Sequence, residues 1–196
     1  MLSSMAPLTI WTIGHSSQSF EAFARLLLGE EIDVVVDVRS FPYSRFAPHF
    51  DREDLAPALR ERGIRYGYLG EELGGRPAKE EHYDQDGHAL YGLMAKEPAF
   101  REAIDRLVAG ARDHRVALMC SEAEPRCCHR RLLVGKVLAE QGVELRHILR
   151  GGGVEVEQDV SIDPQGQAAL FGTEEAVWRS TQSVSRRRRL SASSAA

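Results

Sequence analysis

A strand–helix–strand succession near the start of the sequence constrains the fold more than any other feature. Residues 8–13 are a short β-prone run, and the apolar residues of 20–28 recur at the spacing of one helix face. Residues 32–37 are continuous and rich in β-branched side chains, which is typical of a strand covered on both faces. Two buried strands joined by a helix make a βαβ unit and favour a parallel sheet.

Later segments extend this pattern into a complete domain. We expect an α/β fold, a Rossmann-like three-layer sandwich with a mainly parallel sheet of about five strands. The remaining strands are predicted at 64–69, 115–120 and 144–149, with an edge strand over 154–160 as an addition. Residues 78–92 have no clear period, and a loop of this length is often functional, for example as a lid. The predicted division is an extension at 1–7, one domain at 8–160 and a C-terminal extension at 161–196.

Composition limits the classes of function. The 196 residues, 43% of them hydrophobic, suit one domain with a full core. No apolar run approaches the roughly 20 residues needed to span a bilayer, and the start of the chain lacks the features of a signal peptide, so a cytoplasmic protein without a membrane partner is expected. Three cysteines, two of them adjacent, suit free thiols, metal ligands or catalytic groups better than a disulfide framework.

Charge disfavours nucleic-acid binding by the body of the protein. The net charge is −4, whereas non-specific binding depends on neutralising phosphates with Lys and Arg. The run Arg186–Arg189 lies in a Ser-rich tail and offers contact to a polyanion. Composition favours a solvated terminus as the simpler interpretation of this tail.

Reactive side chains follow three of the predicted strands. They are Gly14, His15 and Ser16 after the first strand, Asp37, Arg39 and Ser40 after the second, and Cys120 and Glu122 after the fourth. The carboxyl ends of parallel strands meet at one edge of a sheet, where open α/β folds bind their ligands. We therefore predict that these clusters converge on one active site.

His15 and Glu122 are the candidates for acid–base catalysis. A histidine with a pKa near 6.5 exchanges protons at neutral pH, and the helix that follows offers N–H groups to an anion beside Gly14 and Ser16. The alternative is that His15 caps or packs against that helix. Glu122, at a strand end expected to be partly buried, is predicted to have a raised pKa and to act as acid, base or nucleophile. Its alternative is a salt bridge to Arg126 or Arg130.

Asp37 and Arg39 alternate along a strand and therefore point to the same face. They either pair with each other, or Arg39 grips a phosphate or carboxylate bidentately, with Arg45 in the following loop joining it. The residues alone do not decide between these roles.

The segment from Cys120 to Arg130 has three interpretations. Cys120, Cys128 and His129 are suitable ligands for zinc or iron, although their spacing is irregular. Alternatively, Cys120 followed by Arg126 resembles the anion loop of phosphatases and rhodaneses, and rhodanese domains also carry an Asp-Val-Arg like that ending at Arg39. Glu122 and Glu124 would repel an anion there. The third interpretation is structural, with Cys127 or Cys128 as a small buried hydrophobe, and it is favoured for Cys127.

Taken together, these clusters resemble a bacterial family catalogued as domain of unknown function 488. The resemblance covers about residues 8–150 and includes Thr12–Ser16, Asp37–Arg39 with Pro42 and Ser44, Leu73–Gly75, Cys120 with Glu122, Cys128–Arg130, and His147 with Ile148. It implies an α/β, Rossmann-like domain with those residues in one pocket. It implies no settled activity, although members are sometimes labelled as related to DNA repair.

The leading hypothesis is a cytoplasmic enzyme that acts on a nucleotide, a nucleoside or a nucleic-acid end, by hydrolysis or transfer at a phosphoester or N-glycosidic bond. His15 and Glu122 would be the acid–base pair, Asp37 an orienting carboxylate, and Arg39 and Arg130 the anion clamps, with His129 as a further ligand-binding residue. Two alternatives stay open. They are a rhodanese-like thiol enzyme using Cys120, and a non-enzymatic module that binds a metal or nucleic acid.

Overall fold

A single mixed sheet forms the centre of the computed structural model, which describes residues 7–157 and 177–184. Its strand order is β3-β2-β4-β1-β5-β6, and every neighbouring pair is parallel except β5 and β6. The strands are β1 (Thr9–Gly14), β2 (Val34–Asp37), β3 (Arg65–Tyr68), β4 (Val116–Cys120), β5 (Glu144–Ile148) and β6 (Val154–Val156). The predicted α/β fold is confirmed. The sheet has six strands rather than about five, because the antiparallel edge strand β6 completes it.

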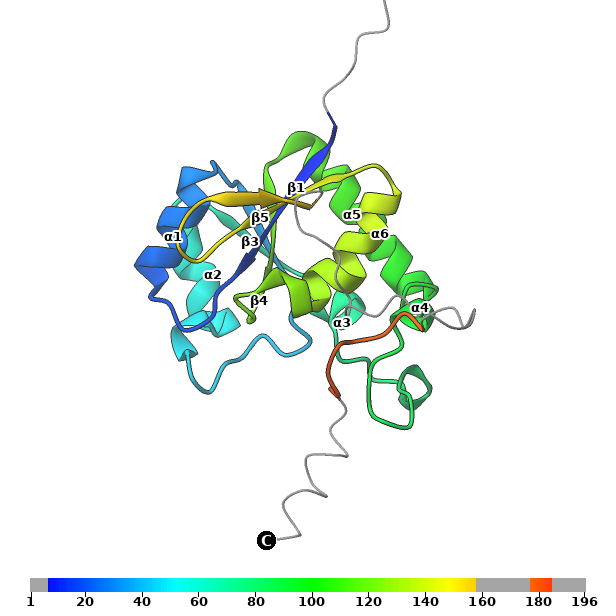
Figure 1. The fold of residues 1–196 in the computed structure, drawn as a ribbon. Coiled ribbons are helices and arrows are strands. Elements are labelled where there is room, and N and C mark those ends of the chain that lie inside the picture. The colour runs from blue at the N-terminus through cyan, green and yellow to red at the C-terminus, as the bar shows by residue number, and fades with distance from the viewer. Residues whose placement is uncertain (1–6, 158–176, 185–196) are drawn as a thin grey trace, which may run out of the picture.

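Helices cover both faces of the sheet (Figure 1). One face carries α1 (Phe20–Gly29) and α2 (Arg52–Glu61), and the other carries α5 (Pro98–Asp113) and the π-helical segment η4 (Arg130–Gly135), which continues into α6 (Lys136–Glu140). The shorter helical turns are η1 (Pro48–Phe50), α3 (Gly70–Leu73), η2 (Glu80–His82), α4 (Tyr91–Met94) and η3 (Pro125–Cys127).

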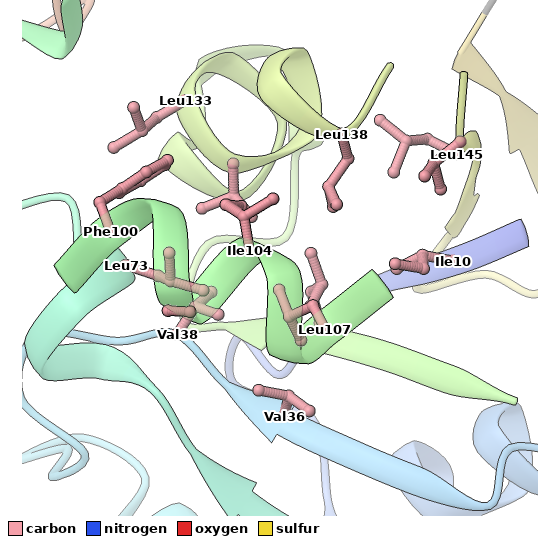
Figure 2. Close-up of a cluster of buried hydrophobic side chains, with 14 of the residues drawn as sticks. Ile10, Val36, Val38, Leu73, Phe100, Ile104, Leu107, Leu133, Leu138 and Leu145 are labelled. Atoms are coloured by element: carbon pink, nitrogen blue, oxygen red, sulfur yellow. The ribbon is translucent and has the colours of Figure 1, made fainter. Parts of the chain in front are cut away.

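Side chains that alternate along the strands fill two separate cores. On β2, Val35 packs against α1 and α2, whereas Val36 faces the opposite layer. Figure 2 shows this second core, where Val36 and Ile10 meet Ile104 of α5 and Leu138 of α6. Successive side chains of the strands point to opposite faces, and the helices bury one face with a period of 3.6 residues, so the expected three-layer sandwich results.

The chain between η2 and α4 is held by a distant segment. Residues 177–184, here called the C-terminal strap, lie along it (orange-red in Figure 1). Ser180 donates its N–H to the carbonyl of Ala89 and accepts from the Ala89 N–H, both at 2.9 Å. Trp178 donates its indole N–H to the carbonyl of Leu132 at 2.8 Å and packs edge-on against Tyr91. The strap is thus bonded both to the 82–92 segment and to the layer of η4.

Two of the sequence expectations concern residues or features beyond this core. Arg186–Arg189 lies outside the described residues, so its contact to a polyanion stays a prediction. Within the parts of the chain that the structure describes, no helix is long and apolar enough to cross a membrane.

A buried polar network ties β5 to β1 and η4. His147 hydrogen bonds to Thr12 Oγ1 at 2.8 Å through Nδ1 and donates from Nε2 to Glu157 at 2.7 Å. Arg131 pairs with the other Glu157 oxygen at 2.8 Å. Burial alone would raise the pKa of Glu157, but its bonds to His147 and Arg131 outweigh this and lower it below the ordinary value of 4.5.

This network predicts acid sensitivity. Because the pKa of Glu157 is depressed in the folded state, its ionised form stabilises the fold above pH 4.5, and this contribution is lost as the pH falls below that value. Wild-type protein should therefore lose unfolding free energy between about pH 5 and about pH 3 more steeply than Glu157→Gln does. Denaturant unfolding at several pH values measures this. Equal slopes for the two proteins would contradict the assignment.

Candidate metal centre

The ends of β1, β2 and β4 converge at one edge of the sheet. The backbone N–H of His15 donates to the carbonyl of Cys120 at 2.9 Å, and Arg39 Nη1 lies 3.1 Å from His15 Nε2. Gly14 makes this approach possible, because a Cβ there would lie 1.8 Å from the carbonyl oxygen of Glu122. The predicted convergence of the three clusters is confirmed, and Gly14 has a steric reason to be glycine.

Cys120, Cys128 and His129 form a compact group at this edge. One donor atom from each lies within 4.8 Å of the other two. His129 Nδ1 is 3.7 Å from the sulfur of Cys120 and 3.9 Å from that of Cys128. The sequence produces this arrangement because β4 ends at Cys120, the η3 turn folds the loop back, and Cys128 and His129 then directly precede η4.

The imidazole of His129 is held by its second nitrogen. Its Nε2–H donates to the carbonyl of Val38 at 2.8 Å, so Nδ1 is the nitrogen that faces the two sulfurs. Gly75 lets the chain pass against the ring, since a Cβ there would lie 2.7 Å from His129 Cγ. A backbone carbonyl that accepts from the far nitrogen is the usual way in which proteins orient a metal-binding histidine.

Electrostatics favour one thiolate in the group. The pKa of Cys120 is lowered well below its ordinary value, because the Cys128 thiol donates a hydrogen bond to it and His129 faces it, against the opposing effect of burial. The pKa of Cys128 is raised by burial and by the neighbouring charge of Cys120. For His129, burial lowers the pKa but the Cys120 thiolate outweighs it and raises the value. The thiolate is the form of cysteine that binds metals and attacks electrophiles.

A pocket of about 220 Å³ opens beside the group. Cys120 and His129 line it, whereas Cys128 lies behind them. The remaining walls come from the loop after β2, the turn at Gly75, helix α4, the loop after β4 and the C-terminal strap; they include Ser40, Phe41, Arg76, Tyr91, Glu122 and Gln182. Three ligands with one side open to a cavity are typical of catalytic zinc sites, because structural sites enclose the metal with four.

His15 and Arg39 belong to a closed network beside this pocket. His15 Nδ1–H donates to the carbonyl of Ser16 at 2.8 Å, so its Nε2 accepts from Arg39. Burial, followed by the charge of Arg39, lowers the pKa of His15 to about 4. Arg39 in turn pairs with Asp37 at 2.7 Å in the interior, and the phenol of Tyr66 donates to the same carboxylate. His15 is therefore neutral at pH 7 with both nitrogens engaged, which suits positioning better than proton transfer.

Other predicted side chains occupy different positions from those expected. Glu122 is exposed rather than partly buried, and it lines the pocket. Arg130 donates to the carbonyls of Glu122 and Ala123 at 2.5 and 2.9 Å, so it holds the loop instead of facing an anion. Arg45 is exposed and is not part of the pocket wall, while Ser40 is.

The anion-loop interpretation requires Arg126 to face the same pocket as Cys120, and it does not. Arg126 is exposed and pairs with Glu124 at 3.6 Å, and it does not line the pocket. The prediction that Cys127 is a buried hydrophobe is wrong, because this thiol is exposed. Its neighbour Cys128 is the buried one. Loop residues whose side chains turn to solvent explain both differences.

Comparison with protein families decides the membership of this chain. Residues 19–137, more than half of the 196, match the family described as Domain of unknown function DUF488. The chain belongs to the DUF488 family. No curated protein and no solved structure matches it. The three candidate metal ligands lie inside the part matched to DUF488, and the C-terminal strap lies outside it.

Two parts of the pocket in this DUF488 chain were not among the predicted site residues. Tyr91 is 3% exposed, its hydroxyl has no hydrogen-bond partner among the described residues, and it lines the pocket. Burial, together with the neighbouring cysteines and Glu122, raises the pKa of this phenol. The aperiodic 78–92 segment was a signal for Tyr91. The strap had no comparable signal, because it has no regular secondary structure and its partners, such as Ala89 and Leu132, lie far away in the sequence.

Proposed function

We propose that this DUF488 chain is a metal-dependent hydrolase or transferase of the cytoplasm, acting on a nucleotide, a nucleoside or a nucleic-acid end. The observation that carries the proposal is the group of Cys120, Cys128 and His129, with one donor atom of each within 4.8 Å of the others at the wall of a pocket. Thiolate and imidazole donors suit zinc best, and they also suit iron.

The chemistry follows from the open side of the group. A divalent metal held by three protein ligands retains a position for water and lowers the pKa of that water to about 7. Glu122 is an exposed carboxylate in the pocket wall, outside the ligand group, and can accept the proton of this water. The role of the network of Asp37, Arg39 and His15 is then to hold the ends of β1, β2 and β4 in place beside the pocket. Hydrolysis at a phosphoester or N-glycosidic bond is within reach of these groups.

Metal content tests the proposal directly. Protein purified under reducing conditions should contain about one equivalent of zinc or iron, because three ligands converge there. Cys128→Ala should contain almost none, and Cys127→Ala, which removes the adjacent exposed thiol, should keep the wild-type content. Elemental analysis of the three proteins makes the measurement. Wild-type protein that stays free of metal after incubation with zinc would contradict the proposal.

Chelation separates this proposal from the thiol-enzyme alternative. Removing the metal should abolish turnover on a nucleotide and nucleoside panel, and restoring it should recover the activity. A rhodanese-like enzyme using Cys120 has one observation in its favour, the lowered pKa of a thiol that lines the pocket. Its activity would survive chelation and disappear on alkylation. Activity that resists chelation would therefore replace the metal-dependent proposal with the thiol enzyme.

A further inference from the structure

The pocket beside the metal group is lined by aromatic rings and neutral polar groups. Phe41 and Tyr43 come from the loop after β2, and Tyr91 comes from α4. Thr181 and Gln182 come from the C-terminal strap. Planar rings stack on aromatic side chains, and hydroxyl and amide groups form hydrogen bonds with the polar edge of such a ring. This lining therefore suits a planar polar heterocycle.

Gln182 lines the pocket, where its carboxamide can form hydrogen bonds with the polar edge of a bound ring. Its backbone carbonyl accepts from Ser180 Oγ at 2.7 Å, and Ser180 is itself bonded to Ala89, so the strap fixes the residue at the pocket. Its side chain is exposed, and its carboxamide has no hydrogen-bond partner among the residues that the structure describes. A carboxamide offers a donor and an acceptor side by side, the pattern that pairs with the edge of a nucleobase.

Electrostatics disfavour a phosphate deep in the pocket. Two arginines line it, but Arg39 is committed to Asp37, and Glu122 adds a negative charge to the same wall. Arg76 is the other, and it is exposed at the rim. A neutral ring avoids the repulsion by Glu122 that an anion would meet. The inner pocket is therefore better matched to a base, with any phosphate outside near Arg76.

The volume of the pocket also favours a single base as the ligand. A volume of about 220 Å³ is below the ~300–1,000 Å³ typical of pockets that enclose drug-sized ligands. One ring with its substituents fits such a space, and the sugar and phosphate of a nucleotide would remain outside. The base is then the part of the substrate that reaches Cys120 and His129.

The ligand set and the carboxylate match one reaction on such a ring. Hydrolytic deamination of bases is performed by two cysteines and a histidine holding zinc, with a glutamate that is not a ligand acting as general acid and base. Here Cys120, Cys128 and His129 form the donor set, and Glu122 lines the same pocket without belonging to it.

We propose that this site removes the amino group of a nucleobase by hydrolysis. The inference rests on the metal-dependent function proposed above. It names the ring as a nucleobase and the bond as its exocyclic carbon–nitrogen bond, in place of a phosphoester or N-glycosidic bond. Glu122 takes a proton from the water held at the open position, and the oxygen of that water adds to the ring carbon bearing the amino group. Glu122 then passes the proton to the amino nitrogen, the carbon–nitrogen bond breaks, and ammonia leaves. One water is consumed, a carbonyl replaces the amino group, and no oxidant is required.

Ammonia release tests the inference. Zinc-loaded full-length protein is incubated with cytosine, adenine and guanine, with their nucleosides, and with short single-stranded oligonucleotides containing each base. At least one substrate should release ammonia in step with a product in which oxygen replaces the amino group, detected by mass spectrometry. Glu122→Gln should lower the rate by about 100-fold or more and retain its zinc. Gln182→Ala should mainly raise KM, and the distant surface control Gln141→Ala should change nothing.

The failure of this inference differs from the failure of the proposed function. Zinc-loaded protein that releases no ammonia from any base, nucleoside or oligonucleotide overturns the deamination. If the same protein cleaves a phosphoester or an N-glycosidic bond in a zinc-dependent way, the metal-dependent function stands. If it binds no metal, both fail. Ammonia release that is unchanged in Glu122→Gln would also overturn the assigned step.

Discussion

Replacing Glu122 by glutamine is expected to lower turnover by about 100- to 10,000-fold, the range associated with loss of a general acid or base. The fold should be unaffected, because the Glu122 side chain is exposed and its backbone carbonyl, not its carboxylate, binds Arg130. Metal content should also be unaffected, because Glu122 lies outside the ligand group. Steady-state kinetics on the first active substrate, elemental analysis and thermal unfolding check the three parts.

Glu124→Gln provides the matched control. Glu124 lies in the same loop, is also exposed, pairs with Arg126 and does not line the pocket. Its substitution removes the same charge from the loop while leaving the pocket wall intact, so turnover should stay near that of the wild type. Equal losses in the two variants would indicate a general electrostatic effect of the loop. Wild-type turnover in Glu122→Gln would remove Glu122 from the reaction.

Asp37→Ala is expected to destabilise the fold by about 3–5 kcal/mol, the usual cost of leaving a buried charge without its partner. The carboxylate is fully buried and binds Arg39 at 2.7 Å, and Arg39 also donates to His15 and to the carbonyl of Phe50. The substitution therefore leaves a guanidinium that is 4% exposed without the carboxylate that binds it. Denaturant unfolding of wild type and variant gives the difference in free energy.

A surface pair supplies the comparison for this experiment. Arg106 pairs with Glu72 at 2.7 Å, but the Arg106 side chain is 58% exposed. Water screens such a pair, and Arg106→Ala should change the free energy of unfolding by no more than about 1 kcal/mol. A comparably small effect for Asp37→Ala would mean that Arg39 finds another partner or reaches solvent, and the closed network at the pocket would need revision.

Residue patterns predicted the layers and the edge of the sheet where the site lies. Continuous apolar runs indicated buried parallel strands, and the reactive groups at Gly14, Asp37 and Cys120 were expected to meet because parallel strands end at the same edge. These patterns could not predict which partner each side chain at this edge of the sheet forms a hydrogen bond with. Arg39 was equally suited to an anion or to Asp37, and burial with Asp37 decided the choice.

The irregular spacing of Cys120, Cys128 and His129 explains why the metal interpretation was weak in the sequence. The seven residues between Cys120 and Cys128 impose no fixed distance between the two thiols, and the η3 turn and the Val38 carbonyl bring the donors together. Of the two adjacent thiols, Cys127 faces solvent and Cys128 faces the interior. The path of the backbone through the tertiary structure decides which of them is buried.

The sequence by itself determined the α/β architecture, the edge at which the reactive residues gather and membership of the DUF488 family, because hydrophobic periodicity and local motifs are properties of neighbouring residues. Tertiary structure alone decided that Glu122 faces the pocket, that Arg130 holds a loop and that the C-terminal strap forms a wall. These outcomes depend on contacts between distant segments, such as Ser180 with Ala89, 91 residues apart, and Ser183 with Gly87, 96 residues apart. Such contacts leave no periodic trace in the chain, because their two partners lie far apart in the sequence and the strap has no regular secondary structure.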